Sequence, residues 1–266
     1  MSLPEPTASS RAVVTGASSG IGVALAEGLA RRGYSLILVA RREDRLKELA
    51  DSLSNRYGVE AEIRAVDLSD REQRGKLCVE LDARDIAVLC NNAGFATYGE
   101  FANANRTRER QQVELNAVAV HDLTLAVLPG MVERGVGAIL ITGSTAGNQP
   151  GPGNAGYAAT KAFANTLAES LHSELTGTGL SCTLLAPGPV RTEYAEVAEV
   201  PNLDKLVPGP LWVSAEQAAE EAIAGMAAGR RRVVPGVFAK VQTVSGQYTP
   251  RAVIGPVLRA VYRKVK

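Results

Sequence analysis

Short buried strands and amphipathic helices alternate along most of this chain, and this alternation limits the possible folds more than any other feature. "AVVTG", which starts at Ala12, predicts a strand; "GIGVALAEGLARRG" predicts a helix closed by Gly33; and "YSLILVA" predicts the next strand. The order repeats downstream. Such alternation is typical of a parallel sheet covered by helices on both faces. We therefore predict an α/β fold with a doubly wound parallel sheet.

The remaining predicted elements continue the same order. They are a charged helix over 43–57, a strand ending at "RAVD", a short helix after Ser69, the strand "IAVLC", a helix over 107–134, the strand "GAILITG", a helix over 155–175, the strand "LSCTLLA" and a last strand in "RRVVPG". No repeat or low-complexity linker interrupts them. We predict a single domain over residues 1–266, with a flexible start at 1–10.

Composition excludes several classes of protein. The 266 residues are 45% hydrophobic and 21% charged with a net charge of +1, which is ordinary for a globular chain and unlike a nucleic-acid binder. No uninterrupted apolar run approaches 18 residues, and the opening "MSLPEPTASSR" has neither a basic start nor an apolar middle. We expect no membrane-spanning helix, no signal peptide and a cytoplasmic location.

Cysteine and histidine give no sign of a metal site. Cys90 and Cys182 lie in predicted strands and Cys78 in a predicted helix, without a CxxC pair, so core packing is the interpretation. His121 and His172 lie in separate predicted helices without neighbouring ligand residues. We predict no metal.

A glycine-rich turn follows the first strand. "TGASSGIG" places Gly16, Gly20 and Gly22 between that strand and the helix after it. Glycines let backbone amides approach a pyrophosphate, and the helix N-terminus favours negative charge. In open parallel sheets, ligands bind at the carboxyl ends of the strands, where this turn lies. The turn predicts a nucleotide-binding site.

A phenol and an ammonium are paired on a later helix. Tyr157 and Lys161 in "YAATK" are four residues apart and share one helical face, and Ser144 lies 13 residues before the tyrosine. The ammonium favours the ionised phenol by Coulomb attraction. Such a tyrosine serves as an acid and base near neutral pH.

Together these motifs resemble the short-chain dehydrogenase/reductase family, whose fold is a single Rossmann-type domain. The resemblance runs over about residues 11–195 and rests on "TGASSGIG", "NNAG" at 91–94, Asn116 in "VELNAVAV", Ser144, "YAATK" and "PGPVRT" at 187–192. The spacing of Gly16 and Gly20, with three residues between them, is also characteristic of that family. Gly143 stands where relatives often carry another serine, and we interpret this departure as harmless.

The resemblance implies a role for each matching residue. Tyr157 exchanges a proton with the substrate oxygen, and Ser144 hydrogen-bonds that oxygen. Lys161 also holds the nicotinamide ribose, and Asn116 positions a water that leads to solvent. The residues expected to bind the cofactor are Gly16, Ser18, Ser19, Gly20, Ile21, Gly22, Arg41, Arg42, Asp67, Leu68, Asn92, Ala93, Gly94, Tyr157, Lys161, Pro187, Gly188, Val190 and Thr192.

The cofactor preference rests on the end of the second strand. An acidic residue there would bind the ribose 2′-hydroxyl of NAD, whereas arginine accommodates the 2′-phosphate of NADP. The chain has Arg41 and Arg42, which can bind phosphate through charge-assisted bonds. We predict NADP(H) over NAD(H), although Ser19 stands where some relatives carry a second basic residue. By resemblance, Asp67 contacts the adenine and Thr192 the nicotinamide amide.

The segment after "PGPVRTE", about residues 189–213, covers the substrate in that family. Its apolar residues, Val197 and Trp212 among them, favour a lipophilic carbonyl or alcohol; packing of the loop onto the domain explains them equally well. A non-catalytic NADP(H)-binding regulator of the same fold is the alternative function. A phosphate-transferring enzyme is disfavoured, because no GxxxxGK[ST] loop is present.

About 30 residues remain after the last predicted strand. In this extension, about 236–266, apolar residues recur at helical spacing and basic residues lie off that stripe. The stripe fits packing onto the same or a neighbouring subunit, and a basic amphipathic helix also fits peripheral membrane contact. By resemblance, we expect a homodimer or homotetramer built from the helices around Asn116 and Tyr157.

Overall fold

One seven-stranded parallel sheet forms the centre of the computed structural model, which describes residues 3–192, 209, 212–236 and 239. Its order is β3-β2-β1-β4-β5-β6-β9. The strands are β1 Arg11–Thr15, β2 Leu36–Ala40, β3 Ala61–Ala65, β4 Ile86–Asn91, β5 Gly137–Thr142, β6 Leu180–Leu185 and β9 Arg232–Val233. Strand order reverses between β1 and β4, which confirms the predicted Rossmann-type arrangement and marks the expected binding crevice.

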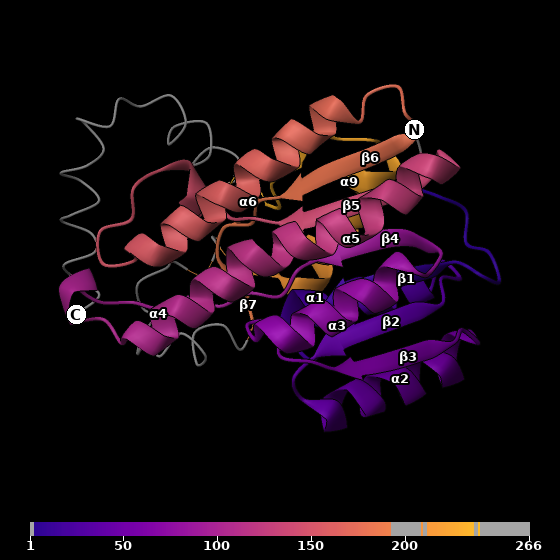
Figure 1. Cartoon of the computed structure of the whole chain (residues 1–266), viewed down its shortest axis with the longest axis horizontal. Helices are drawn as coiled ribbons and strands as arrows, with labels where there is room; N and C mark the ends of the chain where they lie inside the picture. The colour runs from indigo at the N-terminus through magenta and orange to yellow at the C-terminus, as the bar shows by residue number, and fades with distance from the viewer. Residues whose placement is uncertain (1–2, 193–208, 210–211, 237–238, 240–266) are drawn as a thin grey trace.

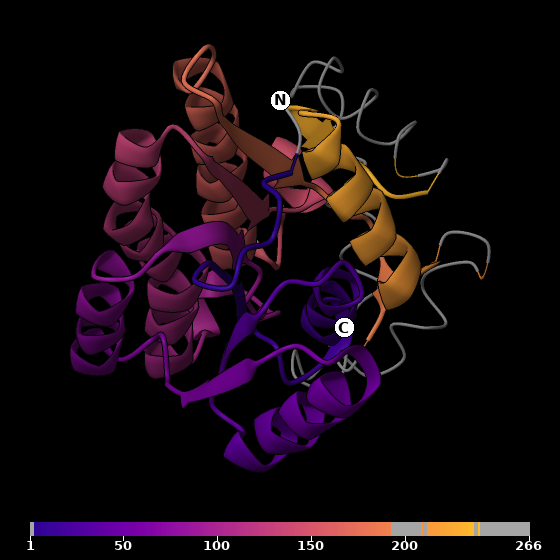
Figure 2. The same cartoon turned by 90° about the vertical axis from the view of Figure 1, so that its right-hand side faces the viewer.

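Helices cover both faces of the sheet (Figures 1 and 2). One layer contains α1 Gly20–Ala30, α2 Glu43–Tyr57 and α9 Ala215–Ala227. The other contains α3 Arg71–Asp82, α4 Arg106–Val113, α5 Ala119–Arg134 and α6 Ala155–Glu174. On β1, Val14 packs against the first layer and Val13 against the second, so the middle of the strand is apolar because both of its faces are buried.

Helix α9 is an element that the sequence reasoning did not assign. It begins after Ser214, whose Oγ accepts a hydrogen bond from the backbone N–H of Gln217, and it packs against α1. A serine before a run of alanine and glutamate is a recognisable N-cap signal. Ahead of α9, β8 Val213–Ser214 pairs in parallel with β7 Val190–Arg191.

The helix predicted over 107–134 is continuous but contains one π-helical turn, η2 Glu114–Val118, between α4 and α5. Single π turns inside α-helices are frequent at functional sites. By length and mean hydropathy (1.5), the stretch Arg106–Arg134 qualifies as a possible membrane span, with 39% of its apolar window buried. Its inner side packs on the sheet through Leu123 and Val127, and a core helix meets the same criterion.

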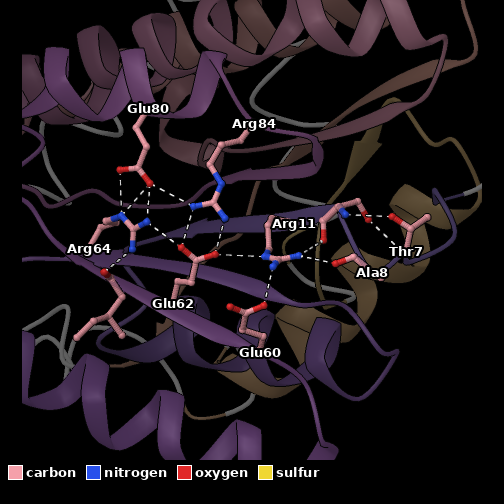
Figure 3. A network of polar contacts seen from close by, with 10 residues as sticks. Thr7, Ala8, Arg11, Glu60, Glu62, Arg64, Glu80 and Arg84 are labelled. Atoms are coloured by element: carbon pink, nitrogen blue, oxygen red, sulfur yellow. Dashed lines mark hydrogen bonds and ion pairs between the residues drawn. The ribbon is translucent and has the colours of Figure 1, made fainter.

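Polar contacts involve both the start of the chain and the edge strand β3. Within residues 3–10, part of the segment predicted to be flexible, the carbonyl of Pro4 accepts a hydrogen bond from the Tyr34 hydroxyl. On the edge strand β3, Glu62 and Arg64 join Arg11 of β1 and Arg84 in one ion-pair network (Figure 3). Paired charges on an edge strand discourage a further strand from adding there.

Candidate active site

The turn between β1 and α1 depends on glycine for both conformation and space. Gly16 and Gly20 have positive φ angles of 69° and 52°. A Cβ on Gly22 would lie 2.1 Å from the Gly16 carbonyl oxygen. The half-buried Ser18, Ser19 and Ile21 complete the turn. This close-packed turn at a helix N-terminus fits a pyrophosphate.

The end of β4 is fastened to the end of β1. Thr15 Oγ1 accepts from the backbone N–H groups of Asn92 (2.9 Å) and Ala93 (3.0 Å), and Asn92 Nδ2 donates to the Thr15 carbonyl at 3.0 Å. A Cβ on Gly16 would lie 2.9 Å from Ala93 Cα. The "NNAG" segment and the glycine turn are therefore in direct contact after the ends of β4 and β1.

Arg42 reaches back to the glycine turn. Its Nε donates to Ser18 Oγ at 3.2 Å and its Nη2 to the Ser18 carbonyl at 3.1 Å, while Arg41 is exposed. Asp67 follows β3, and its Oδ1 accepts from the backbone N–H of Ser69 at 2.9 Å. A cationic group next to the glycine turn and a carboxylate after β3 fit the adenosine half of a dinucleotide phosphate. Leu68, also predicted to bind the cofactor, is buried.

Lys161 lies in the middle of the site with 5% of its surface exposed. Its Nζ donates to the Thr142 carbonyl at the end of β5 (2.7 Å) and lies 5.8 Å from the centre of the Tyr157 ring. Burial lowers the pKa of this ammonium from 10.5 to about 8. Tyr157 and Lys161, predicted to share one helical face, lie near each other on α6 and are both buried.

Asn116 lies in the π turn, and its side chain is held from two directions. Nδ2 donates to the Phe95 carbonyl (2.8 Å) and to Thr160 Oγ1 (3.2 Å), and Oδ1 accepts from the Phe95 N–H at 3.1 Å. A Cβ on Gly94 would lie 3.0 Å from Asn116 Oδ1 and 3.4 Å from Lys161 Nζ. Glycine at 94 thus keeps open the space between an acceptor and a cation.

Ser144 follows β5 in extended conformation and caps the short helix η3 Thr145–Asn148. Its Oγ accepts from the Ala146 N–H at 3.1 Å, and its backbone is bound by Asn165 of α6. Helix α6 therefore carries Tyr157 and Lys161 and also holds the serine loop.

The segment after β6 contacts both the serine loop and the glycine turn. The Pro187 carbonyl accepts from the Thr145 N–H at 3.1 Å, and Gly188 and Val190 lead into β7. A Cβ on Gly20 would lie 2.7 Å from Thr192 Cγ2. The four predicted catalytic residues and the described residues predicted to bind the cofactor thus lie at the end of the sheet formed by the carboxyl ends of its strands. The predicted substrate cover and the C-terminal extension lie almost entirely outside the described residues.

Cysteine and histidine lie outside this constellation. Cys90 and Cys182 are buried in strands, where burial raises the pKa of both thiols to about 12, and Cys78 is half-buried in α3. His172 Nδ1 is 2.9 Å from the Cys182 carbonyl, and His121 is exposed on α5. Within residues 3–192, 209, 212–236 and 239, no group of three His, Cys, Asp or Glu side chains could hold a metal ion.

Residues 10–200 match the family described as short chain dehydrogenase. The chain belongs to the short-chain dehydrogenase family. Among curated relatives of this short-chain dehydrogenase, the very-long-chain 3-oxoacyl-CoA reductase of Rattus norvegicus is 36% identical over 73% of the chain and 63% of the relative. Sulfoacetaldehyde reductase 2 of Chromohalobacter salexigens is 38% identical over 70% of the chain and 74% of the relative. The chain therefore spans less than two thirds of the rat protein.

Solved structures extend the likeness to the whole fold. A short-chain dehydrogenase from Sphingobium yanoikuyae in complex with NADPH is 33% identical, with a TM-score of 0.78 over 93% of this chain and 94% of that one. The bulky-bulky ketone specific alcohol dehydrogenase from Comamonas testosteroni is 27% identical, also with a TM-score of 0.78 and the same coverage.

Three supporting residues escaped the sequence reasoning: Phe95, Thr160 and Asn165. The first two bind the side chain of Asn116, and the third binds the backbone of Ser144. For Asn165 a signal existed, because it continues the four-residue spacing of Tyr157 and Lys161 on one helical face. For Phe95 no sequence pattern pointed to the contact.

Proposed function

We propose that this short-chain dehydrogenase interconverts a carbonyl and a secondary alcohol, with NADP(H) as the hydride carrier. One observation carries the proposal: Tyr157, Lys161 and Ser144 converge at the carboxyl end of β5 and are all buried. A lysine on the surface face of an amphipathic helix would keep its ammonium in water, because burying the charge costs free energy. The alternative, that Tyr157 and Lys161 are a surface pair on an amphipathic helix without a chemical role, is accordingly disfavoured.

The protein's part is to move a proton and to hold the reacting oxygen. The Tyr157 hydroxyl donates its proton to the carbonyl oxygen during reduction, and Ser144 Oγ donates a hydrogen bond to the same oxygen. The Lys161 ammonium, anchored on the Thr142 carbonyl, stabilises the phenolate that Tyr157 becomes. The bound nicotinamide supplies the hydride chemistry.

Asn116 and Gly94 support a route for proton return. The space at Gly94 is bordered by Asn116 Oδ1, an acceptor, and Lys161 Nζ, a donor. A water at such a place would have the polar partners that a buried water needs. We assign to Asn116 the holding of that water, through which Lys161 exchanges protons with solvent.

Arg42 supports a preference for NADP(H) over NAD(H). Its guanidinium is placed against Ser18 of the glycine turn, where a 2′-phosphate would meet a fixed positive charge. The Sphingobium yanoikuyae relative was solved with NADPH, and a relative from Beutenbergia cavernae, 32% identical, with NADP. Exposed Arg41 adds a second positive charge nearby.

A lipophilic substrate is the class that we propose. The names of two similar proteins specify bulky or long-chain substrates. They are the very-long-chain 3-oxoacyl-CoA reductase of rat and the bulky-bulky ketone specific alcohol dehydrogenase of Comamonas testosteroni. A hollow of about 170 Å³ beside the first turn of α6 is lined by apolar Ala96 and Phe101 and also by polar Arg108, Glu109 and Asn154. The support for a lipophilic substrate therefore comes from these two similar proteins.

We also propose a homo-oligomer formed through α5 and α6, in the cytoplasm. Large apolar side chains on these helices face solvent in the single chain, with Leu125 56% and Phe163 41% exposed. Burying such side chains against a second copy would remove that area from water. Peripheral membrane contact through the C-terminal extension is the less favoured alternative.

Tyr157→Phe tests the reaction. Because the phenyl ring keeps the packing and loses the proton, we expect kcat to fall by about 10² to 10⁴ while the Kd for NADPH changes less than about threefold. Tyr57→Phe, on α2 and remote from the site, is the matched control. A Tyr157→Phe protein with near-normal kcat would refute the chemistry. Wild-type protein that binds NADPH but turns over no carbonyl in a broad panel would favour the non-catalytic regulator.

A further inference from the structure

The backbone of Ser144 is bound by a side chain on both its polar groups. Asn165 Oδ1 accepts from the Ser144 N–H at 3.2 Å, and Asn165 Nδ2 donates to the Ser144 carbonyl at 3.0 Å. The same Nδ2 also donates to Asn148 Oδ1 at 3.2 Å. One amide therefore binds Ser144 as the backbone of a neighbouring strand would, and also holds the end of η3.

Asn165 belongs to the same helical face as the acid–base pair. Tyr157, Lys161 and Asn165 follow one another at four-residue intervals on α6, and Asn165 is only 4% exposed. A buried amide of this kind is stabilised only while its hydrogen bonds are made. The helix that places the tyrosine thus also fixes the distance to the serine loop.

Gly143 provides the room for this amide. A Cβ on Gly143 would lie 1.9 Å from Asn165 Oδ1 and 2.8 Å from Leu184 Cδ1. Gly143 has no positive φ angle, so space rather than conformation requires glycine there. The departure from the family pattern at position 143, interpreted from sequence as harmless, thus coincides with an amide that leaves no space for a side chain.

We propose that Asn165 is a positioning residue for Ser144, and that Gly143 and Asn165 form a matched pair. Asn165 touches no reacting atom; it sets the place of the Ser144 backbone and thereby the point from which Oγ reaches the substrate oxygen. This inference rests on the proposed carbonyl reduction. It adds a residue, outside the Asn116, Ser144, Tyr157 and Lys161 set, on which the rate depends.

A double-mutant cycle with Ser144→Ala tests the proposal. Asn165→Leu keeps the approximate size and removes the two hydrogen bonds to Ser144 and the one to Asn148, so we expect kcat to fall about 10- to 100-fold with the Kd for NADPH within about threefold of wild type. In the Ser144→Ala background the same substitution should lower kcat by less than about threefold, because the hydroxyl that Asn165 positions is already absent. Multiplicative losses in the double variant would overturn the proposal, as would unchanged kcat in Asn165→Leu.

Further variants keep the proposal testable if Asn165→Leu does not fold. Asn165→Ala can replace it in the same double-mutant cycle with Ser144→Ala. Thr166→Ala, at an exposed neighbouring position on α6, is the matched control. Gly143→Ser should lose activity by overlap with the amide, and Gly143→Ser with Asn165→Ala should recover at least about tenfold of it. No recovery would overturn the matched pair. Loss of NADPH binding in both Asn165 variants would mark Asn165 as a packing residue and overturn its positioning role.

Amide hydrogen exchange separates this inference from the proposed function. If wild-type protein reduces no carbonyl, the proposed function fails, but exchange at the Ser144 amide still reports the clamp. We expect exchange there to accelerate at least about tenfold in Asn165→Ala and to stay unchanged in Thr166→Ala. Unchanged exchange in Asn165→Ala would overturn the inference, whatever the activity.

Discussion

Replacing Lys161 by methionine should make the protein more stable and inactive. Lys161 is an ammonium in a buried position, and burial lowers its pKa from 10.5 to about 8. Methionine has a similar length and no charge to desolvate. The substitution therefore separates what the residue contributes to the reaction from what it costs the fold.

The magnitude follows from two opposing contributions. A pKa lowered from 10.5 to about 8 corresponds to a destabilisation of about 3 kcal/mol at neutral pH. Against this, Lys161→Met removes the hydrogen bond from Nζ to the Thr142 carbonyl, which is worth about 1 to 2 kcal/mol. We expect a net gain of about 1 to 2 kcal/mol, or a Tm higher by about 2 to 6 °C.

The pH dependence gives the sharper assay. Between pH 8 and 10.5 the unfolded lysine keeps its proton while the folded one has lost it, so the stability of the wild type rises with pH through that interval. The advantage of Lys161→Met should be full below pH 8, vanish at about pH 9 to 10, where the remaining burial cost equals the lost hydrogen bond, and turn into a net loss near pH 10.5. Urea unfolding of both proteins at pH 7 and pH 10, at one protein concentration, measures the difference.

Lys76→Met is the matched control. Lys76 is exposed and pairs with Glu72 four residues earlier on α3, so its loss should change stability by less than about 0.5 kcal/mol at either pH. The reasoning is refuted if Lys161→Met melts at or below wild type at pH 7. It is refuted equally if the difference between the two proteins is the same at pH 10.

Three further outcomes are expected. Arg42→Ala should raise KM for NADPH about 10- to 100-fold and leave KM for NADH nearly unchanged, measured by steady-state kinetics; equal effects on both would contradict the phosphate role. Hydrogen bonding from Arg84 lowers the pKa of Glu62 from 4.5 to about 2, so this carboxylate stabilises the fold above pH 4.5 and the contribution is lost as pH falls toward 2. Glu62→Gln should therefore lose about 2 kcal/mol in urea unfolding at pH 7 and much less near pH 2; a pH-independent loss would contradict this. Light scattering should find an oligomer that Leu125→Lys or Phe163→Lys weakens, and a monomeric wild type would defeat the proposed assembly.

The residues that we propose for the chemistry could be predicted from the sequence because their signals are local. Tyr157 and Lys161 share a face through the period of one helix, and the glycine turn is recognisable from its place after the first strand. The parallel sheet followed from alternating elements for the same reason. Each of these predictions depends on residues within one element or at its end.

What holds those residues in place was decided by contacts between elements distant in sequence. Arg42 turns back to Ser18 across 24 positions, and Asn165 reaches Ser144 across 21. The local sequence around Arg42 or Asn165 does not predict which residue each side chain contacts. Helix α9 also escaped notice, although Ser214 gave an N-cap signal, because no motif drew attention to it.

Gly143 shows the difference most directly. From the sequence it is a missing serine, and no rule of local conformation opposes a side chain there, since its φ angle is not positive. Only the folded chain places the Asn165 amide 1.9 Å from where that Cβ would lie. Periodicity along the chain determines which residues of a helix or strand face the site. The space available to a side chain at a position such as 143 depends on which segment packs against it, and that is decided only by the packing of α6 against the sheet.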